Sequence, residues 1–204
     1  MTALRFRPGE KPDCPILGEL VRLSSGGVVD YLYHDLKPGS SAAQVVAHTL
    51  EQGIHPATYR NTIVAELCGD IAGMALSYPS SFQGVNPAAA PLLPPERLAR
   101  MRDFYSARVE GSWYIDALAV LEPFRGRGIG RRLVELSEQR CAKDGYRVVS
   151  LIVFADNEPA FNLYRSLGFR VVRRVRLESN EFIPHTGGCL LLAHPLTPDA
   201  GVPG

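Results

Sequence analysis

Hydrophobic positions in the first half of the chain repeat at helical spacing in two places. Asp13 is placed to cap one helix, and the capping box Ser41–Gln44 is placed to begin another. The apolar positions that follow these caps are Ile16, Leu17, Leu20 and Leu23, then Val45, Val46 and Leu50. Two strand-like runs, 62–67 and 71–78, flank Gly69–Asp70, which suits a tight antiparallel turn. The pattern predicts two helices followed by a β-hairpin.

The second half of the chain alternates strands with helices. The pattern predicts a strand, a helix, a strand, a helix and two further strands at 113–121, 129–144, 147–154, 158–167, 169–177 and 189–193. A strand, helix, strand order implies a parallel pair joined by a right-handed crossover. Together with the hairpin, this order predicts an α/β (α+β) fold with a mixed sheet.

Residues 79–110, between the two halves, have a different composition. Their prolines, at 79, 87, 91, 94 and 95, exclude a central strand and indicate a long loop. We expect one short helix from about Pro95 to Tyr105, because proline is favoured in a first helical turn. Long loops inside compact folds are usually functional or mobile. The segment 79–110 is therefore our candidate for a substrate-side lid.

The charge balance narrows the classes of partner. The chain has 22 basic and 21 acidic side chains, a net charge of +1, which gives no global electrostatic reason to bind nucleic acid or an anionic membrane. The four cysteines form no C-x-x-C pair, so we expect a reducing cytoplasm and neither a zinc site nor a disulfide framework. The longest apolar run, near 148–155, is far shorter than the ~20 residues that span a bilayer. We expect one cytoplasmic domain over 1–204.

The segment most informative about chemistry runs from Arg125 to Arg132, between a predicted strand and a predicted helix, and reads RGRGIGRR. Glycines let the main chain approach a ligand, and the N–H groups at a helix start favour an anion. The arginines add donors suited to phosphate. The segment therefore predicts a pyrophosphate site, with a plain turn and a solvated basic rim as the alternative.

Two other phosphate-binding patterns compete with this interpretation. A Rossmann dinucleotide site also lies between a strand and a helix, but this chain has G-x-G-x-G, and its acidic residue, Asp156, comes too late after the next strand. A Walker loop is excluded because no Gly-Lys-Ser/Thr follows the glycines. A nucleotide-binding regulatory domain stays open as a third hypothesis.

Two motifs in order resemble those of the GNAT superfamily of N-acetyltransferases. Arg125-x-x-Gly128-x-Gly130 matches R/Q-x-x-G-x-G/A, and residues 157–169 are similar to N-x-x-A-x-x-L-Y-x-x-x-G-F. The resemblance covers 113–172. It implies a GNAT-type mixed, mostly antiparallel sheet with a splayed parallel strand pair and flanking helices, and acetyl-CoA as cosubstrate.

The resemblance also implies which residues hold acetyl-CoA. The main chain of one strand would pair with the pantetheine arm, the glycine loop would hold the pyrophosphate, Asn157 would lie near the pantetheine, and Tyr164 would face the sulfur. The strand and loop residues are Leu118, Ala119, Val120, Arg125, Gly126, Arg127, Gly128, Ile129, Gly130 and Arg131. The helical pattern agrees, because Tyr164 shares the apolar face of its helix with Ala160 and Leu163. An ordinary core tyrosine is the alternative.

The implied reaction, attack of an amine on a thioester, needs a proton acceptor. An alkylamine has a pKa of about 10.4 and is protonated at neutral pH. Asp116, an isolated carboxylate in an apolar strand, is the candidate base, with Glu66 and Glu110 as weaker alternatives. A water chain could serve instead, and Asp116 would then be a structural residue held by backbone N–H groups.

Histidines contribute weaker hypotheses. His185 is a candidate for the acceptor pocket or for proton transfer, although we expect a loop histidine exposed to solvent. His34, His48 and His55 show no metal-ligand spacing, so we predict no metal.

The predicted function is acetyl-CoA-dependent transfer of an acetyl group to a primary amine, by direct attack in a ternary complex. The alternative is a non-catalytic acyl-CoA-binding or sensor domain. Fold does not select the acceptor, which is a small-molecule or peptide amine. The resemblance also implies that the protein forms a homodimer.

Overall fold

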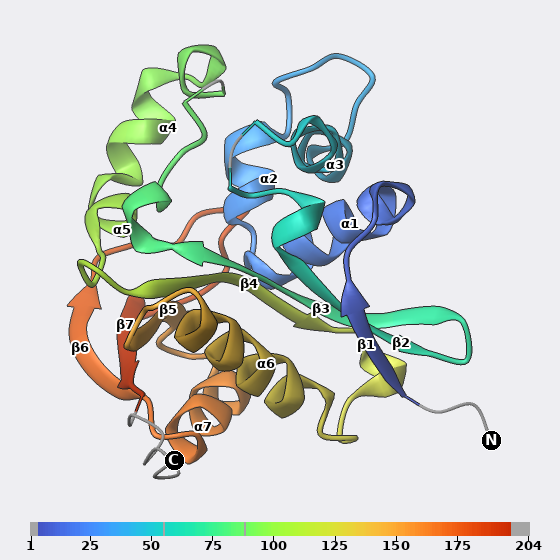
Figure 1. The fold of residues 1–204 in the computed structure, drawn as a ribbon. Helices are drawn as coiled ribbons and strands as arrows, with labels where there is room; N and C mark the ends of the chain where they lie inside the picture. The colour runs from blue at the N-terminus through green and yellow to red at the C-terminus, as the bar shows by residue number, and fades with distance from the viewer. Residues whose placement is uncertain (1–3, 55, 88, 197–204) are drawn as a thin grey trace, which may run out of the picture.

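The centre of the computed structural model, which describes residues 4–54, 56–87 and 89–196, is a seven-stranded sheet (Figure 1). The strand order is β1-β2-β3-β4-β5-β7-β6, in which β4 and β5 are parallel and all other neighbours antiparallel. The strands are β1 Arg5–Pro8, β2 Thr62–Leu67, β3 Asp70–Pro79, β4 Trp113–Val120, β5 Val148–Phe154, β6 Arg170–Val175 and β7 Cys189–Pro195. The predicted mixed, mostly antiparallel sheet is confirmed.

Helices cover both faces of the sheet. The helices α1 Cys14–Ser24, α2 Val28–Tyr33 and α3 Ala42–Gln52 lie on one side, and α6 Ile129–Lys143 and α7 Glu158–Ser166 lie on the other (Figure 1). Short 3-10 helices occupy Lys11–Asp13, Tyr59–Asn61, Ser80–Phe82, Ala90–Leu92 and Glu122–Phe124. Leu17 and Leu50 pack with Met74 on the first side, and Val134 packs with Val149 on the second. Each face of the sheet therefore has its own apolar core.

The two predicted caps behave differently. At the start of α3, Ser41 Oγ accepts from Gln44 N at 3.2 Å and Gln44 Oε1 accepts from Ser41 N at 2.8 Å, as the capping box requires. The prediction that the Asp13 side chain caps α1 is wrong. Its carboxylate instead accepts from Glu10 N at 2.8 Å and from the Arg7 guanidinium at 2.7 Å. Asp13 thereby ties β1 to the start of α1.

Two elements, β1 and α2, were not predicted. β1 has four residues and is held by its antiparallel pairing with β2. α2 has six residues and follows Gly26 and Gly27, whose φ values are 55° and 95°. A Cβ on Gly27 would overlap the main chain of Phe182, so only glycine lets these segments approach. Long-range contacts, and not local periodicity, define both elements.

The segment 79–110 contains two short helices, α4 Pro95–Arg100 and α5 Arg102–Ser106. The prediction of one helix over Pro95–Tyr105 is therefore wrong. The break lies at Met101, whose ψ of 3° leaves the helical region. The Met101 side chain is fully buried and packs with Leu93 and Ala107 in a cluster that includes α2 residues. Burial of the Met101 side chain stabilises the fold more than a continuous helix would, and it fixes the segment against α2.

Two irregularities in β4 shape the centre of the molecule. The β3–β4 register shifts where Leu76 and Ser77 oppose Ala117 and Ile115, so Asp116 is the extra residue of a β-bulge. Pairing of β4 with β5 covers only the first three residues of β4, ending at Ile115. Beyond that point the two parallel strands diverge. The predicted splayed pair is confirmed.

Candidate active site

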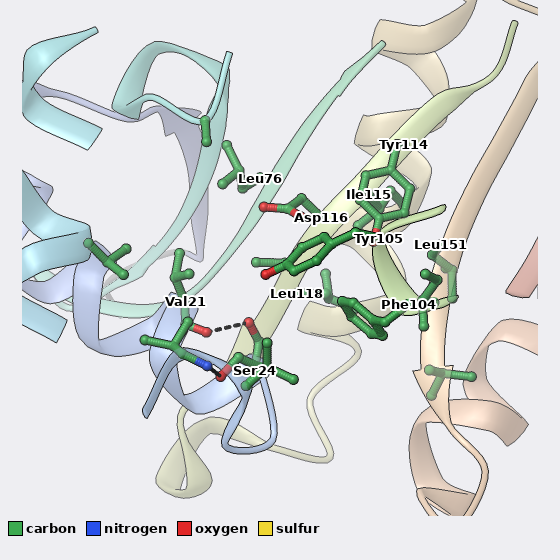
Figure 2. A pocket seen from close by; sticks show the side chains of 18 of the residues that line it. Val21, Ser24, Leu76, Phe104, Tyr105, Tyr114, Ile115, Asp116, Leu118 and Leu151 are labelled. Atoms are coloured by element: carbon green, nitrogen blue, oxygen red, sulfur yellow. Dashed lines mark hydrogen bonds between the residues drawn. The ribbon is translucent and has the colours of Figure 1, made fainter. Parts of the chain in front are cut away.

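A cavity of about 220 Å³ is lined by β4, β5 and α7, by α1 to α3, and by the segment 79–110. Figure 2 shows part of its wall, with the Asp116 carboxylate and the Tyr105 hydroxyl pointing to the side of Val21 and Ser24. Tyr164 of α7 also lines it. Residues of the segment that line the cavity are Gly84, Val85, Asn86, Phe104 and Tyr105. The two predicted catalytic residues therefore share one cavity.

The bulge in β4 presents Asp116 to this cavity. Solvent reaches the carboxylate through the cavity, although protein atoms surround it as densely as a buried group. Because this environment limits hydration, burial raises the pKa of Asp116 to about 6, while a hydrogen bond with the Tyr78 hydroxyl opposes the rise. Among the described residues this hydroxyl, and not backbone N–H groups, is the partner of the carboxylate. The backbone N–H partners expected for a structural Asp116 are thus not seen among the described residues, and whether its role is structural or catalytic stays a prediction.

Four tyrosines besides Tyr164 line the cavity together with Asp116. They are Tyr33, Tyr78, Tyr105 and Tyr114. Burial, with the negative charge of Asp116 as a further cause, raises the pKa of Tyr33 to about 12 and those of the other three well above the usual value. All four hydroxyls therefore stay protonated at neutral pH and can act as donors, as Tyr78 does toward Asp116. None of the four was predicted from the sequence, where the one available signal was the position of Tyr78 and Tyr114 near strand ends.

Tyr164 and Asn157 belong to the same wall but differ in their partners. Tyr164 is 7% exposed and packs against Phe169 with ring centroids 5.7 Å apart, and its hydroxyl has no hydrogen-bond partner among the described residues. Burial raises the pKa of Tyr164 well above its usual value, so the hydroxyl remains a donor. Asn157 Oδ1 accepts from Ala160 N at 3.2 Å and caps α7. Asn157 therefore has a structural role beside its place in the cavity.

The glycine loop has the conformation that its sequence suggests. Gly126 and Gly128 have φ values of 73° and 76°, and Gly128 is the N-cap of α6. A Cβ at either position would meet no neighbour, so conformation and not space requires glycine. The side chain of Ile129, by contrast, is 2% exposed and anchors the helix in the core. At Gly130 a Cβ would come within 3.4 Å of Leu163.

The arginines of this loop lie on the surface beside the α6 N-terminus. Arg125 Nε donates to Val120 O at 3.1 Å, and Arg131 donates to Ser166 Oγ at 2.7 Å. Arg127 is exposed, and Arg132 pairs with Glu135 at 3.1 Å. Arg125 and Arg131 thus brace the loop against β4 and α7, and positive charge surrounds the unpaired N–H groups of the helix. This arrangement is suited to a phosphate-bearing ligand.

The strand segment Leu118, Ala119 and Val120 joins the cavity to this loop. It lies beyond the last β4–β5 pair, so β5 no longer covers that edge of β4. The Ala119 side chain is buried in the core below α1 and α3, while Leu118 and Val120 pack near α6. The free edge suits an extended ligand with amide groups, which could run from the cavity to the arginines.

The weaker carboxylate candidates lie elsewhere. Glu66 accepts from Arg7 at 2.8 Å on the outer strands, and Glu110 is exposed, 3.9 Å from Arg108. Neither lines the described cavity. Asp116 is therefore the carboxylate that the fold brings to Tyr164.

His185 is not the solvent-exposed histidine expected from the sequence. Its ring stacks on Phe154 with centroids 3.8 Å apart, and Nδ1 lies 2.8 Å from Asp156 Oδ1. Asp156 also accepts from Thr186 N at 2.7 Å. These contacts fix the loop before β7 against β5.

The residues that the structure describes contain no group of three His, Cys, Asp or Glu arranged to hold a metal ion. His55 lies outside them. None of their helices has the length and apolarity needed to cross a membrane.

Comparisons with known proteins agree with this geometry. The profile of a family described as "Acetyltransferase (GNAT) family" matches residues 44–169, well over half of the chain. Mycothiol acetyltransferase of Corynebacterium kroppenstedtii is 40% identical over 78 residues, 38% of this chain and 21% of that protein. N-alpha-acetyltransferase 30 of Saccharomyces cerevisiae is 33% identical over 101 residues, 49% of this chain and 53% of that protein. The matches therefore span about half or less of these relatives.

A solved structure supports the fold over nearly the whole chain. An N-acetyltransferase from Staphylococcus aureus Mu50 superposes with a TM-score of 0.67 at 20% identity, covering 93% of this chain and 99% of that one. At this identity the likeness concerns the fold alone. With the profile match and the splayed β4–β5 pair, it places the chain in the acetyltransferase (GNAT) family.

Proposed function

We propose that this protein transfers an acetyl group from acetyl-CoA to a primary amine, by direct attack in a ternary complex. The observation that carries the proposal is that Asp116, the proposed base, and Tyr164, the proposed hydrogen-bond donor, line one cavity at the divergence of β4 and β5. Relatives named as mycothiol and N-alpha-acetyltransferases support acetyl transfer to an amine as the class of reaction.

The proposed cosubstrate site runs along β4 to the start of α6. The free edge at Leu118, Ala119 and Val120 would receive the pantetheine amides. The segment 125–131 would hold the pyrophosphate through main-chain N–H groups and exposed guanidinium groups. Asn157 would lie beside the pantetheine arm. This path ends at Tyr164 in the cavity wall.

Asp116 is proposed as the base on the acceptor side. The incoming ammonium loses its proton to the Asp116 carboxylate, directly or through one water, and the freed nitrogen attacks the thioester carbonyl. A nitrogen–carbon bond forms, the carbon–sulfur bond breaks, and the thiolate of CoA leaves. The nitrogen gives up its second proton as the amide forms, and this proton passes through water to the thiolate. With a pKa raised to about 6, Asp116 is ionised at neutral pH and is a stronger base than an ordinary carboxylate.

Tyr164 is proposed as the donor on the leaving side. A thiol, with a pKa of about 8.5, is a stronger acid than a phenol at about 10, so full proton transfer before bond cleavage is unfavourable. A hydrogen bond from the Tyr164 hydroxyl to the developing thiolate is sufficient. The segment 79–110, which supplies part of the cavity wall, is proposed as the substrate-side element.

Thermal unfolding with acetyl-CoA, CoA, NAD and ATP in parallel tests this function, followed by thiol release with pooled amines. A ligand of the native state at about 100 times its Kd adds roughly 2.7 kcal/mol of stability. We expect a shift with acetyl-CoA and CoA alone, then thiol release. A shift without thiol release for any amine would indicate the acyl-CoA sensor, and a shift with NAD or ATP only would refute the acetyl-CoA site.

A further inference from the structure

The charges of the residues that line the cavity limit which acceptors can bind there. Of the described residues that line the cavity, Asp116 is the only one with a charged side chain, and none is lysine, arginine or histidine. The other lining side chains are aliphatic, aromatic, hydroxyl-bearing or amide-bearing, together with the thiol of Cys189. The cavity can therefore neutralise one positive charge, and it has no cation to pair with an acid.

The surroundings of Asp116 on the acceptor side are largely apolar. Phe104 and Tyr105 of α5 and Val21 of α1 line the same space, and Figure 2 shows the Asp116 carboxylate facing it. Tyr33 and Tyr105 place buried hydroxyl groups near the carboxylate. One end of this space is thus acidic, and the rest is mainly aromatic or aliphatic, with uncharged hydroxyl and amide groups among the lining side chains.

We propose that the acceptor is a small primary amine with an apolar body and no carboxylate next to the amine, such as an arylalkylamine. The ammonium pairs with Asp116, and the apolar body lies between α5 and α1, against Phe104, Tyr105 and Val21. This inference rests on the proposed function and specifies its substrate class.

A carboxylate on the carbon that bears the amine is disfavoured by electrostatics. It would lie close to Asp116 and repel it, and no cation of the cavity wall would compensate for its lost hydration. A second ammonium is also disfavoured, because the wall offers it no second carboxylate. Free amino acids and polyamines therefore match the site less well than monoamines.

The size of the cavity, about 220 Å³, favours a small molecule over a polypeptide. Three N-terminal helices, residues 84–86 and α5 all contribute to its wall. A peptide acceptor would need an open path for its chain beyond the first residues. The lining residues instead provide apolar contact for a small acceptor.

Steady-state thiol release with a matched acceptor series tests the proposal. The series is 2-phenylethylamine, phenylalanine amide, phenylalanine, 1,4-diaminobutane and a tetrapeptide that begins with phenylalanine. We expect kcat/KM for 2-phenylethylamine to exceed that for phenylalanine about tenfold or more, because of the added negative charge. Phenylalanine amide should recover most of the loss, since it has the same shape without the charge.

A charge introduced into the wall should reverse the preference. Ser24, the last residue of α1, lines the cavity, and a helix C-terminus favours a cation there. Ser24→Lys is expected to raise the phenylalanine to 2-phenylethylamine ratio of kcat/KM about tenfold. Ser24→Met, with an uncharged chain of similar length, should leave the ratio within about twofold of wild type.

The outcomes separate this proposal from the function on which it rests. Equal or better use of phenylalanine, 1,4-diaminobutane or the peptide would overturn the substrate class and leave acetyl transfer standing. An unchanged ratio in Ser24→Lys, in a protein that still folds and binds acetyl-CoA, would also overturn it. Acetyl-CoA binding without thiol release for any acceptor would instead refute the enzyme, and the substrate class with it.

Discussion

The Tyr78 hydroxyl hydrogen-bonds with the Asp116 carboxylate across the bulge between β3 and β4. Because the hydroxyl stays protonated, it is the donor, and it stabilises the ionised carboxylate. Burial acts in the opposite sense and is the larger effect. The basicity of Asp116 is thus a balance between the two.

Removing this donor should make Asp116 more basic. In Tyr78→Phe the ionised carboxylate loses stabilisation, so the pKa of Asp116 rises and the acidic limb of the kcat/KM profile moves to higher pH. Tyr114→Phe is the matched control, since Tyr114 faces the same cavity without that hydrogen bond to Asp116. If the acidic limb of the kcat/KM profile stays in place in Tyr78→Phe, or moves equally in both variants, the assignment of Tyr78 as the donor to Asp116 is contradicted.

If Asp116 is the base, the enzyme is active only when the Asp116 carboxylate is ionised. In the wild type, kcat/KM should fall as pH drops through about 6, where the carboxylate becomes protonated. Asp116→Asn should lower kcat by about 10²-fold to 10⁴-fold and abolish that inflection, while acetyl-CoA still raises the melting temperature. Wild-type turnover in the Asn variant would transfer the role of base to a water chain.

The raised pKa of Asp116 also affects stability. The folded state binds the proton more tightly than the unfolded state does, so the wild type loses stability as pH rises from about 4 to about 6. Solvent in the cavity weakens the effect, and we expect about 1 kcal/mol. Asp116→Asn lacks this loss, so its stability relative to wild type should increase between pH 4 and pH 7. Urea unfolding at the two pH values measures the difference, and a constant difference would argue against the shift.

Tyr164→Phe isolates the leaving-group step. Removing the hydroxyl should reduce kcat about tenfold or more, because the developing thiolate loses its donor. The phenyl ring keeps its packing against Phe169, so the Kd for acetyl-CoA should change little. Stopped-flow thiol release together with calorimetric titration of acetyl-CoA separates the two quantities. Unaltered turnover would remove Tyr164 from the chemistry.

Two glycines with positive φ values, at opposite ends of α6, allow an effect on cosubstrate binding to be distinguished from an effect on stability. Gly128 begins α6, and Gly145 follows its other end; their φ values are 76° and 83°, and a Cβ on either meets no neighbour. Each change to alanine should cost about 1 kcal/mol of stability. Only Gly128→Ala should weaken acetyl-CoA binding, about tenfold, because it disturbs the helix N-terminus proposed to hold the pyrophosphate. Similar Kd values for acetyl-CoA in the two variants would show that the glycine loop does not bind the cosubstrate.

The order of elements and the glycine loop were readable from the sequence, because both depend on local physics. Helical spacing and strand patterning identified the main helices and strands, and the capping box marked where α3 begins. The positive φ values of Gly126 and Gly128 are a property of glycine itself. The two motifs gave the family because they lie within one continuous part of the chain.

The cavity and its chemistry depend on tertiary structure. Asp116 reaches the cavity through a bulge that exists only because β4 pairs with β3, and Tyr33 and Tyr105 meet there from separate helices. β1, with four residues, has too little sequence to show a pattern, and burial of Met101 broke a helix that local propensity favours. Contacts between residues far apart in the chain decide such features, and periodicity within one segment does not report those contacts.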